Sequence, residues 1–260
     1  MSTISQEDTD VLRRAKDTLE NPGLAAKITN VIGLPLERAM KQLPNKWLTI
    51  IHRATHHSLM IALDAALATV NTQRSAPSRN GLHRVMVAGT GAVGGAFGLA
   101  ALPVELPVST MVMLRSIVAI ARAEEESLHA PDTRLACLAV FALGGSSKLD
   151  DASESGYFAI RAALASAVAD AARYVTVRGG AGPTAPAIVR LIAQIANRFG
   201  VTVTQKAAAQ AVPLVGAAGG AAINVLFINH FQDMAWGHFT VRRLERKYGS
   251  EVVRSMYQEL

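Results

Sequence analysis

The chain of 260 residues carries 26 Lys and Arg residues against 20 Asp and Glu residues, which gives a net charge of +6. Half of the residues are hydrophobic but only 5% are aromatic, which favours closely packed helices over aromatic-rich strands. The single cysteine, Cys137, excludes a disulfide within the chain and a thiolate metal cluster. The N-terminal residues lack the basic and apolar regions of a signal peptide, so we expect a cytoplasmic protein.

The first part of the chain has the hydrophobic spacing of amphipathic helices. Asn21-Pro22-Gly23 interrupts this pattern, and Pro35 predicts a kink in the second helix. We expect helices at residues 5–20, 24–42 and 45–70. A polar stretch at 71–81 is typical of a linker, so we predict an N-terminal helical segment over 1–75 and a larger helical domain over 76–260.

Two long segments without a charged residue dominate the rest of the chain, at 85–104 and 207–232. Both are rich in Gly and Ala, and each contains glycines four residues apart, such as Gly91 and Gly95. Small residues at this spacing let two helices approach closely, in lipid or in a protein core. We therefore predict an all-α helical bundle with these two segments as its central, adjacent helices. Further helices are expected at residues 107–127, 132–143, 152–177, 184–199 and 221–248.

The two uncharged segments are long enough to cross a bilayer, since about 20 apolar residues are needed. Their many glycines, and the polar residues of 207–232, make insertion only marginally favourable. Three arrangements stay open: buried central helices of a bundle, a hairpin embedded in the membrane, and helices that lie in the plane of the membrane surface.

Three glycines, Gly89, Gly91 and Gly94, match the G-x-G-x-x-G pattern of dinucleotide-binding folds. However, Pro103 and Pro107 interrupt the helix that should follow, and the later chain lacks the alternation of strands and helices that such a fold needs. We therefore expect neither a nucleotide nor another cofactor. Nucleic acid is not an expected partner either, because the basic residues form a short cluster without interleaved aromatic residues.

Three histidines lie close together within the helix predicted at 45–70. His52 and His56 are four residues apart, a spacing at which two imidazoles can share a metal ion. The H-E-x-x-H pattern of zinc proteases is absent, because Arg53 and Ala54 occupy its second and third positions. We favour a solvent-exposed helix face over a metal site, and we expect no metal in the protein.

The start of the helix expected at 152–177 concentrates polar side chains. Asp151 in the N-cap position and Glu154 three residues later form a variant of the capping box. A nucleophile at Ser153 or Ser155 is conceivable, but the G-x-S-x-G pattern of hydrolases is absent, because Ser153 occupies its first glycine position around Ser155. Tyr157 and Arg161 follow one turn apart on the same helix. We favour capping and packing over catalysis for these residues.

Polar residues also recur along the last long helix. Asn224, His238 and Glu245 are separated by multiples of seven residues and share a stripe, while His230 and Asp233 lie on another face. Polar groups inside such an apolar helix destabilise it unless they are paired. We expect these residues to hold neighbouring helices together by hydrogen bonds; the alternative is that they line a polar pocket.

Four stretches of the chain together match one known pattern. Residues Asp151 to Arg161 fit D-x-S-x-x-G-Y-F-x-x-R, and the glycine-rich stretches 89–98 and 215–224 and the stretch 230–249 accompany them. Over about residues 80–250 the chain thereby resembles the bacterial EcsC family, which is named for a gene beside a transporter of the ATP-binding cassette type. The resemblance implies a helical protein with a membrane-linked role, and it implies no particular reaction.

The functional expectation rests on charge as well as on the apolar segments. Arg242, Arg243, Arg246 and Lys247 form the densest basic cluster, which suits the anionic surface of a membrane. We expect a non-enzymatic protein that binds lipid or a membrane protein partner, with the inner face of the membrane as the place of action. One alternative is a hydrolase that uses the acidic, serine and histidine residues above, and another is a soluble carrier of an apolar ligand.

Overall fold

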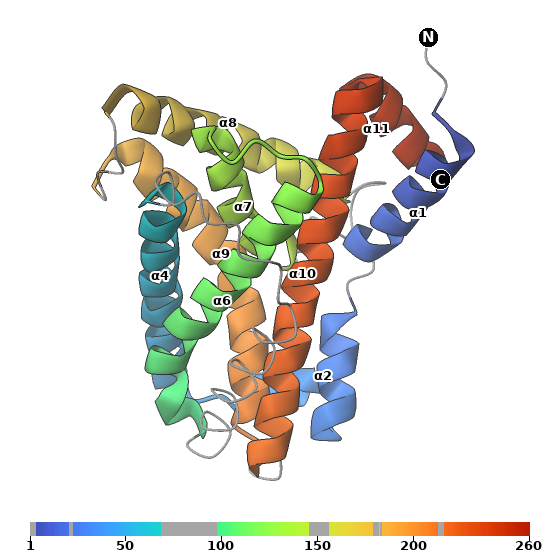
Figure 1. The fold of residues 1–260 in the computed structure, drawn as a ribbon. Coiled ribbons are helices and arrows are strands. Elements are labelled where there is room, and N and C mark those ends of the chain that lie inside the picture. The colour runs from blue at the N-terminus through green and yellow to red at the C-terminus, as the bar shows by residue number, and fades with distance from the viewer. Residues whose placement is uncertain are drawn as a thin grey trace.

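The computed structural model describes residues 4–20, 23–68, 98–145, 156–178, 182, 184–212 and 216–260. Within these ranges the chain forms α-helices and one short 3-10 helix, and it contains no strand. The predicted all-α helical bundle is confirmed (Figure 1). The elements are α1 (Gln6–Glu20), α2 (Leu24–Ile32), α3 (Leu36–Lys41), α4 (Asn45–Ala68), η2 (Gly98–Ala101), α6 (Leu102–Ala123), α7 (Pro131–Leu143), α8 (Gly156–Arg178), α9 (Pro186–Gln210), α10 (Gly216–Tyr248) and α11 (Ser250–Glu259).

The helix α10 is 33 residues long and runs the length of the bundle (Figure 1). It packs against α1 and α2 on one side and against α6, α7 and α9 on the other. Helix α4 adds a further layer by packing against α6 and α9. The helices of residues 1–75 therefore contact those of residues 76–260 directly, and the linker predicted at 71–81 lies outside the described residues.

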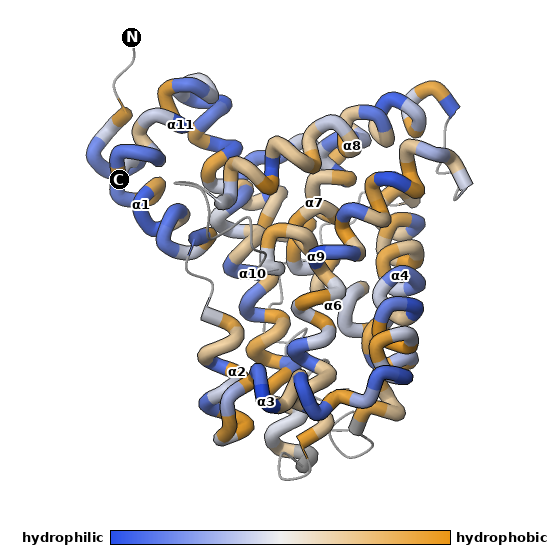
Figure 2. Tube along the Cα trace, turned by 180° about the vertical axis from the view of Figure 1, so that it is seen from behind, coloured by the Kyte–Doolittle hydropathy of each residue, from blue (hydrophilic) through white to orange (hydrophobic). Residues whose placement is uncertain are grey.

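Phenylalanines fill the core where α7, α9 and α10 meet. The ring centroids of Phe141 and Phe199 are 4.9 Å apart, and Phe231 packs against both rings. All three side chains are fully buried. The peripheral helices α1, α4 and α11 instead alternate hydrophilic and hydrophobic residues, as helices with one buried face do (Figure 2).

Helix α1 lies directly on α10 because Gly237 has no side chain. A Cβ atom at Gly237 would lie 2.8 Å from Leu19 Cγ and 3.3 Å from the carbonyl oxygen of Ala15. Leu12, Ala15 and Leu19 form the buried face of α1. The glycine thus sets how closely the first helix approaches the last long one.

The helices predicted at 45–70 and 132–143 agree closely with α4 and α7. The helix predicted over 24–42 is instead two helices, because Gly33 adopts a left-handed φ of 68° that ends α2 and Pro35 precedes α3. The pattern predicted a kink at this place, and the glycine turns it into a break.

The segment 207–232 is not the single central helix that its composition predicts. Helix α9 ends at Gln210 and α10 begins at Gly216, so the segment is divided between two helices. Pro213 in the sequence explains this break, because a proline disfavours helical backbone at the residue before it. Of the segment 85–104, residues 85–97 lie outside the described part of the chain, and the remainder forms η2 and the first turn of α6.

A buried ion pair joins α6 to α9. Lys206 Nζ lies 2.6 Å from Glu105 Oε1, and the two side chains are 0% and 3% exposed. The Gln210 amide donates to the other carboxylate oxygen at 3.3 Å, and Lys206 Nζ lies 4.8 Å from the centre of the Phe227 ring. Burial lowers the pKa of Lys206, while Glu105 opposes this shift by favouring the charged ammonium. Each charge is therefore tolerated in the core only because the other is present.

Removing one member of this pair should be much more harmful than removing both. We expect Lys206→Met to lower the free energy of unfolding by about 3 to 5 kcal/mol, because it leaves a carboxylate buried without a cation. Glu105→Leu combined with Lys206→Met should recover most of this loss. Urea denaturation of the three proteins measures the effect, and a loss below about 1 kcal/mol in the single variant would contradict it.

Candidate functional site

The start of α8 meets α10 at a hydrogen bond between two buried rings. The Tyr157 hydroxyl lies 2.9 Å from His238 Nδ1, and both side chains are buried. Burial raises the pKa of Tyr157 to about 12. Burial, reinforced by the nearby charges of Arg161 and Arg242, lowers the pKa of His238 well below its usual value. Both groups are therefore neutral at pH 7, and the hydroxyl and Nδ1 share one hydrogen bond whose donor is set by the tautomer of His238.

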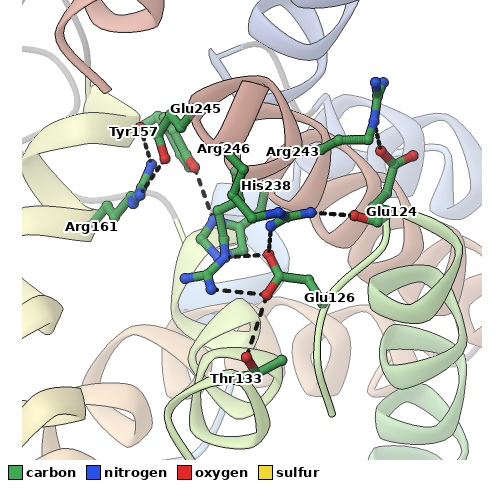
Figure 3. Close-up of polar contacts among 10 residues, drawn as sticks. Glu124, Glu126, Thr133, Tyr157, Arg161, His238, Arg243, Glu245 and Arg246 are labelled. Carbon is green, nitrogen blue, oxygen red and sulfur yellow. Dashed lines mark hydrogen bonds and ion pairs between the residues drawn. The ribbon is translucent and has the colours of Figure 1, made fainter. Parts of the chain in front are cut away.

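Charged side chains surround this pair and connect it to the chain ends. Arg161 donates to both carboxylate oxygens of Glu245, at 2.8 and 2.6 Å (Figure 3). Glu20, at the end of α1, accepts from the Tyr257 hydroxyl at 3.0 Å and from the Tyr157 amide at 3.4 Å. These contacts join α1, α8, α10 and α11 at one end of the bundle.

The basic end of α10 binds an acidic turn, which we define as Glu124–Glu126 between α6 and α7. Arg242 donates to both oxygens of Glu126, at 2.7 and 3.0 Å. Arg246 pairs with the same carboxylate (Figure 3). Arg243 donates to Glu124 at 2.8 Å. Burial alone would raise the pKa of Glu126, but the hydrogen bonds and charges of the two arginines outweigh it and lower that pKa.

Asp8 of α1 completes the pairing of this basic cluster. Lys247 donates to Asp8 Oδ2 at 2.7 Å, the Tyr248 hydroxyl donates to the same oxygen at 2.8 Å, and Arg243 lies 3.9 Å from Oδ1. The hydrogen bond from Lys247 contributes most to a lowered pKa of Asp8. The four basic residues that the sequence assigns to a membrane surface thus all face acidic side chains of their own chain.

A second polar cluster closes the C-terminal end of α7. The carbonyl oxygen of Gly144 accepts from His230 Nε2 at 2.9 Å and from the Thr202 hydroxyl at 3.3 Å, while Arg198 donates to the carbonyl oxygen of Ala142 at 2.7 Å. These side chains satisfy carbonyl groups that a helix end leaves unpaired. A Cβ atom at Gly144 would lie 2.3 Å from His230 Nε2, so only glycine permits this contact.

His230 is held in one protonation state by this arrangement. Because a carbonyl oxygen only accepts, Nε2 carries the proton, and Nδ1 has no hydrogen-bond partner within the described ranges. Burial lowers the pKa of His230 to about 4. The ring is therefore a neutral donor at pH 7 and serves to cap α7.

The structure brings together only some of the residues that the sequence analysis selects. Tyr157, Arg161 and His238 meet at the end of α8, whereas His230 lies eight residues from His238, about 12 Å along the helix axis. Asn224 is buried on α10 and Asp233 is exposed. The three residues that begin the motif, Asp151, Ser153 and Glu154, lie outside the described residues, so the hydrolase alternative stays a prediction.

The most strongly paired acidic residues were not selected from the sequence. Glu20, Glu105, Glu124 and Glu126 hold cations or hydroxyls that come from distant parts of the chain. One signal was present for Lys206, which is a lone charge among apolar residues of a helix and therefore needs a buried partner. The identity of that partner depends on which helix lies opposite.

The chemistry of these clusters is that of fixed hydrogen bonds and paired charges. Burial raises the pKa of the Cys137 thiol to about 12, so it is not a nucleophile at neutral pH. The part of the chain that the structure describes holds no group of three or more His, Cys, Asp or Glu side chains placed to bind a metal ion. The first cluster holds α8 against α10, and the second holds the C-terminal end of α7 against α9 and α10.

Comparison with known protein families identifies the family of this chain. The model of the EcsC protein family matches residues 6–244, nearly the whole chain. The chain belongs to the EcsC family. The match includes α1 to α4 and therefore extends beyond the stretch 80–250 on which the resemblance rested. No curated protein and no solved structure matches the chain.

The neutral state of His230 gives the EcsC-family chain a defined response to acid. Below about pH 6.5 the unfolded chain binds a proton at this histidine, while the folded chain does not until about pH 4. Stability is thus lost as the pH falls through this interval. Between about pH 7.5 and pH 5 the free energy of unfolding should fall by about 2 kcal/mol more in the wild type than in His230→Gln. Urea denaturation at both pH values tests this, and equal losses would contradict it.

The acidic turn should contribute more to stability than an exposed ion pair does. Glu126→Gln leaves two arginines without their carboxylate, and we expect it to lower the free energy of unfolding by about 1 to 2 kcal/mol, less than for a fully buried pair because both arginines are partly exposed. Asp10→Asn is the matched control, since Asp10 pairs with Arg13 in solvent and should change stability by less than about 0.5 kcal/mol. Similar losses of stability in the two variants would contradict the larger contribution that we expect from the acidic turn.

Proposed function

We propose that this protein associates with the surface of an anionic membrane through the outer face of α6. We call this face the outer stripe. Helical spacing puts its members on one side of α6, opposite the side that packs against α4 and α10. Its exposed members are Val104, Val108, Arg115 and Arg122, and the partly buried Met111, Val118 and Ala119 lie between them.

The observation that carries the proposal is an exposed apolar surface followed by exposed arginines on the same stripe, neither of which forms an ion pair with a described residue. Val104 is 75% exposed and Val108 45% exposed. Arg115 and Arg122 are exposed and form no ion pair with another described residue, and the stripe contains no carboxylate. Apolar side chains that enter the acyl region and arginines at the level of the headgroups are the two elements of interfacial binding. Each arginine near an anionic surface adds about 1 kcal/mol.

The contacts of α6 favour a position on the membrane over a passage through it. The stretch Leu99–Ala123 is long and apolar enough to cross a bilayer. However, half of its most apolar 18-residue part is buried inside the bundle. Its buried side carries Glu105, which is paired with Lys206 of α9. Insertion would separate this ion pair in a medium of low dielectric constant, which is strongly unfavourable. Surface association leaves the bundle intact.

This proposal differs from the expectation drawn from the basic residues of α10. Arg242, Arg243, Arg246 and Lys247 are already neutralised by the acidic turn and by Asp8. Paired charges attract a lipid surface much less than free ones do. The contact with lipid is therefore assigned to the arginines of α6.

Vesicle binding of matched variants tests the proposal. Val104→Ser with Val108→Ser should lower the fraction that sediments with phosphatidylglycerol-containing vesicles about tenfold, because it removes apolar area from the acyl region. Val177→Ser with Val189→Ser is the control, since these valines of α8 and α9 are 76% and 48% exposed and the chemical change is the same. Equal effects of the two pairs, or no binding by the wild type, would refute the assignment.

The arginines of the stripe can be examined in the same assay. Arg115→Gln with Arg122→Gln should weaken binding to phosphatidylglycerol vesicles about tenfold and leave the weak binding to phosphatidylcholine vesicles unchanged. Arg173→Gln with Arg178→Gln on α8 changes the same number of exposed charges and is the control. A loss of binding that follows net charge alone, and is equal in both variants, would argue against a site on α6.

A further inference from the structure

The exposed face of α4 carries two histidines in a geometry that neither the fold nor the proposed membrane contact uses. Helix α4 is continuous from Asn45 to Ala68, so His52 and His56 lie one turn apart on the same side. Both side chains are exposed. Neither has a hydrogen bond or an ion pair with another residue in the described ranges, so both rings are available to a ligand.

Imidazole nitrogens at this spacing can bind one metal ion together. The Cβ atoms of residues i and i+4 are about 5 to 6 Å apart on a helix, which lets both rings approach one ion at about 2.0 to 2.1 Å. Imidazole suits Ni²⁺, Cu²⁺ and Zn²⁺, whereas Mg²⁺ and Ca²⁺ require oxygen ligands. We propose that His52 and His56 form a two-histidine site for a divalent transition-metal ion of this nitrogen-preferring class.

The surroundings of the pair define what kind of site it is. The nearest carboxylate that follows on α4 is Asp64, eight residues beyond His56 and about 12 Å along the axis. The described residues supply no group of three or more such ligands, so within this part of the chain the ion would have two protein ligands. An ion held by two side chains exchanges with solvent, in contrast to the closed four-ligand sites of structural zinc. The site is thus a surface site for an exchangeable ion.

His57 provides a matched control inside the same helix. It is exposed like its neighbour, but it follows His52 by five residues and lies about 100° around the helix from His56. It therefore cannot share an ion with His52 while α4 is helical. A non-specific effect of histidine content would respond equally to the loss of His56 and of His57, whereas the proposed site responds only to the first.

Isothermal titration calorimetry tests the site, with NiCl₂ added to the full chain without an affinity tag. We expect saturable binding in the wild type and in His57→Gln, and at least about tenfold weaker binding in His52→Gln and in His56→Gln. Unchanged circular dichroism spectra without metal verify that all variants fold. Wild-type protein without saturable binding, or equal losses in His56→Gln and His57→Gln, would overturn the proposal.

Thermal unfolding gives a second readout that depends on the helix itself. The unfolded chain does not hold the two rings at helical spacing, so the ion stabilises the folded state. Excess NiCl₂ should raise the midpoint of unfolding in the wild type and in His57→Gln, and it should not raise it in His56→Gln. A shift of equal size in all variants would indicate binding elsewhere and would refute the pair.

Discussion

The charge pairing between α10 and the acidic turn fixes the connection between α6 and α7 on the last long helix. Glu126 accepts from Arg242 and pairs with Arg246, so the turn that follows α6 is fixed on the last long helix. Bidentate contacts between arginine and carboxylate are directional as well as strong, and they define an orientation in addition to an energy. Asp8 extends the same pairing to α1. The same pairing holds the C-terminal end of α6 beside the C-terminal part of α10.

Polar contacts have a particular role in a bundle built from small residues. Alanine-rich helix faces interlock weakly, so hydrophobic burial alone gives little preference for one register over another. The pairs Tyr157–His238 and Lys206–Glu105 each require one alignment of the two helices that carry them. Buried polar groups without partners are strongly unfavourable, and misaligned packings are thereby excluded. We infer that these pairs select the register, while the phenylalanine cluster supplies much of the apolar burial.

The two proposed surfaces lie on different helices and depend on different physics. The outer stripe of α6 combines exposed valines with arginines that pair with no described residue, and its binding would weaken with salt. The histidine pair of α4 depends on coordination bonds between its imidazole nitrogens and a metal ion. Both surfaces require the helices to be held rigidly, which the charged and aromatic contacts of the interior provide.

The sequence by itself determined the helical nature of the chain and much of its local structure. Hydrophobic spacing predicted α4 and α7, and the seven-residue interval correctly put His238 and Glu245 on one face, where both contact α8. These features depend on neighbours within a few residues, which the sequence displays directly. The composition of 207–232 predicted one helix, but the chain breaks between Gln210 and Gly216, because Pro213 disfavours helical backbone at the residue before it.

Tertiary structure alone decided which charges are free and which are paired. Arg242 and Arg115 are both basic residues on largely apolar helices, yet the first meets Glu126 across 116 residues of sequence and the second is exposed without a described partner. Whether a charge attracts a membrane depends on the field that remains after its partners are counted, and those partners come from other helices. Because long-range packing pairs the basic residues of α10, we place the proposed membrane contact on α6.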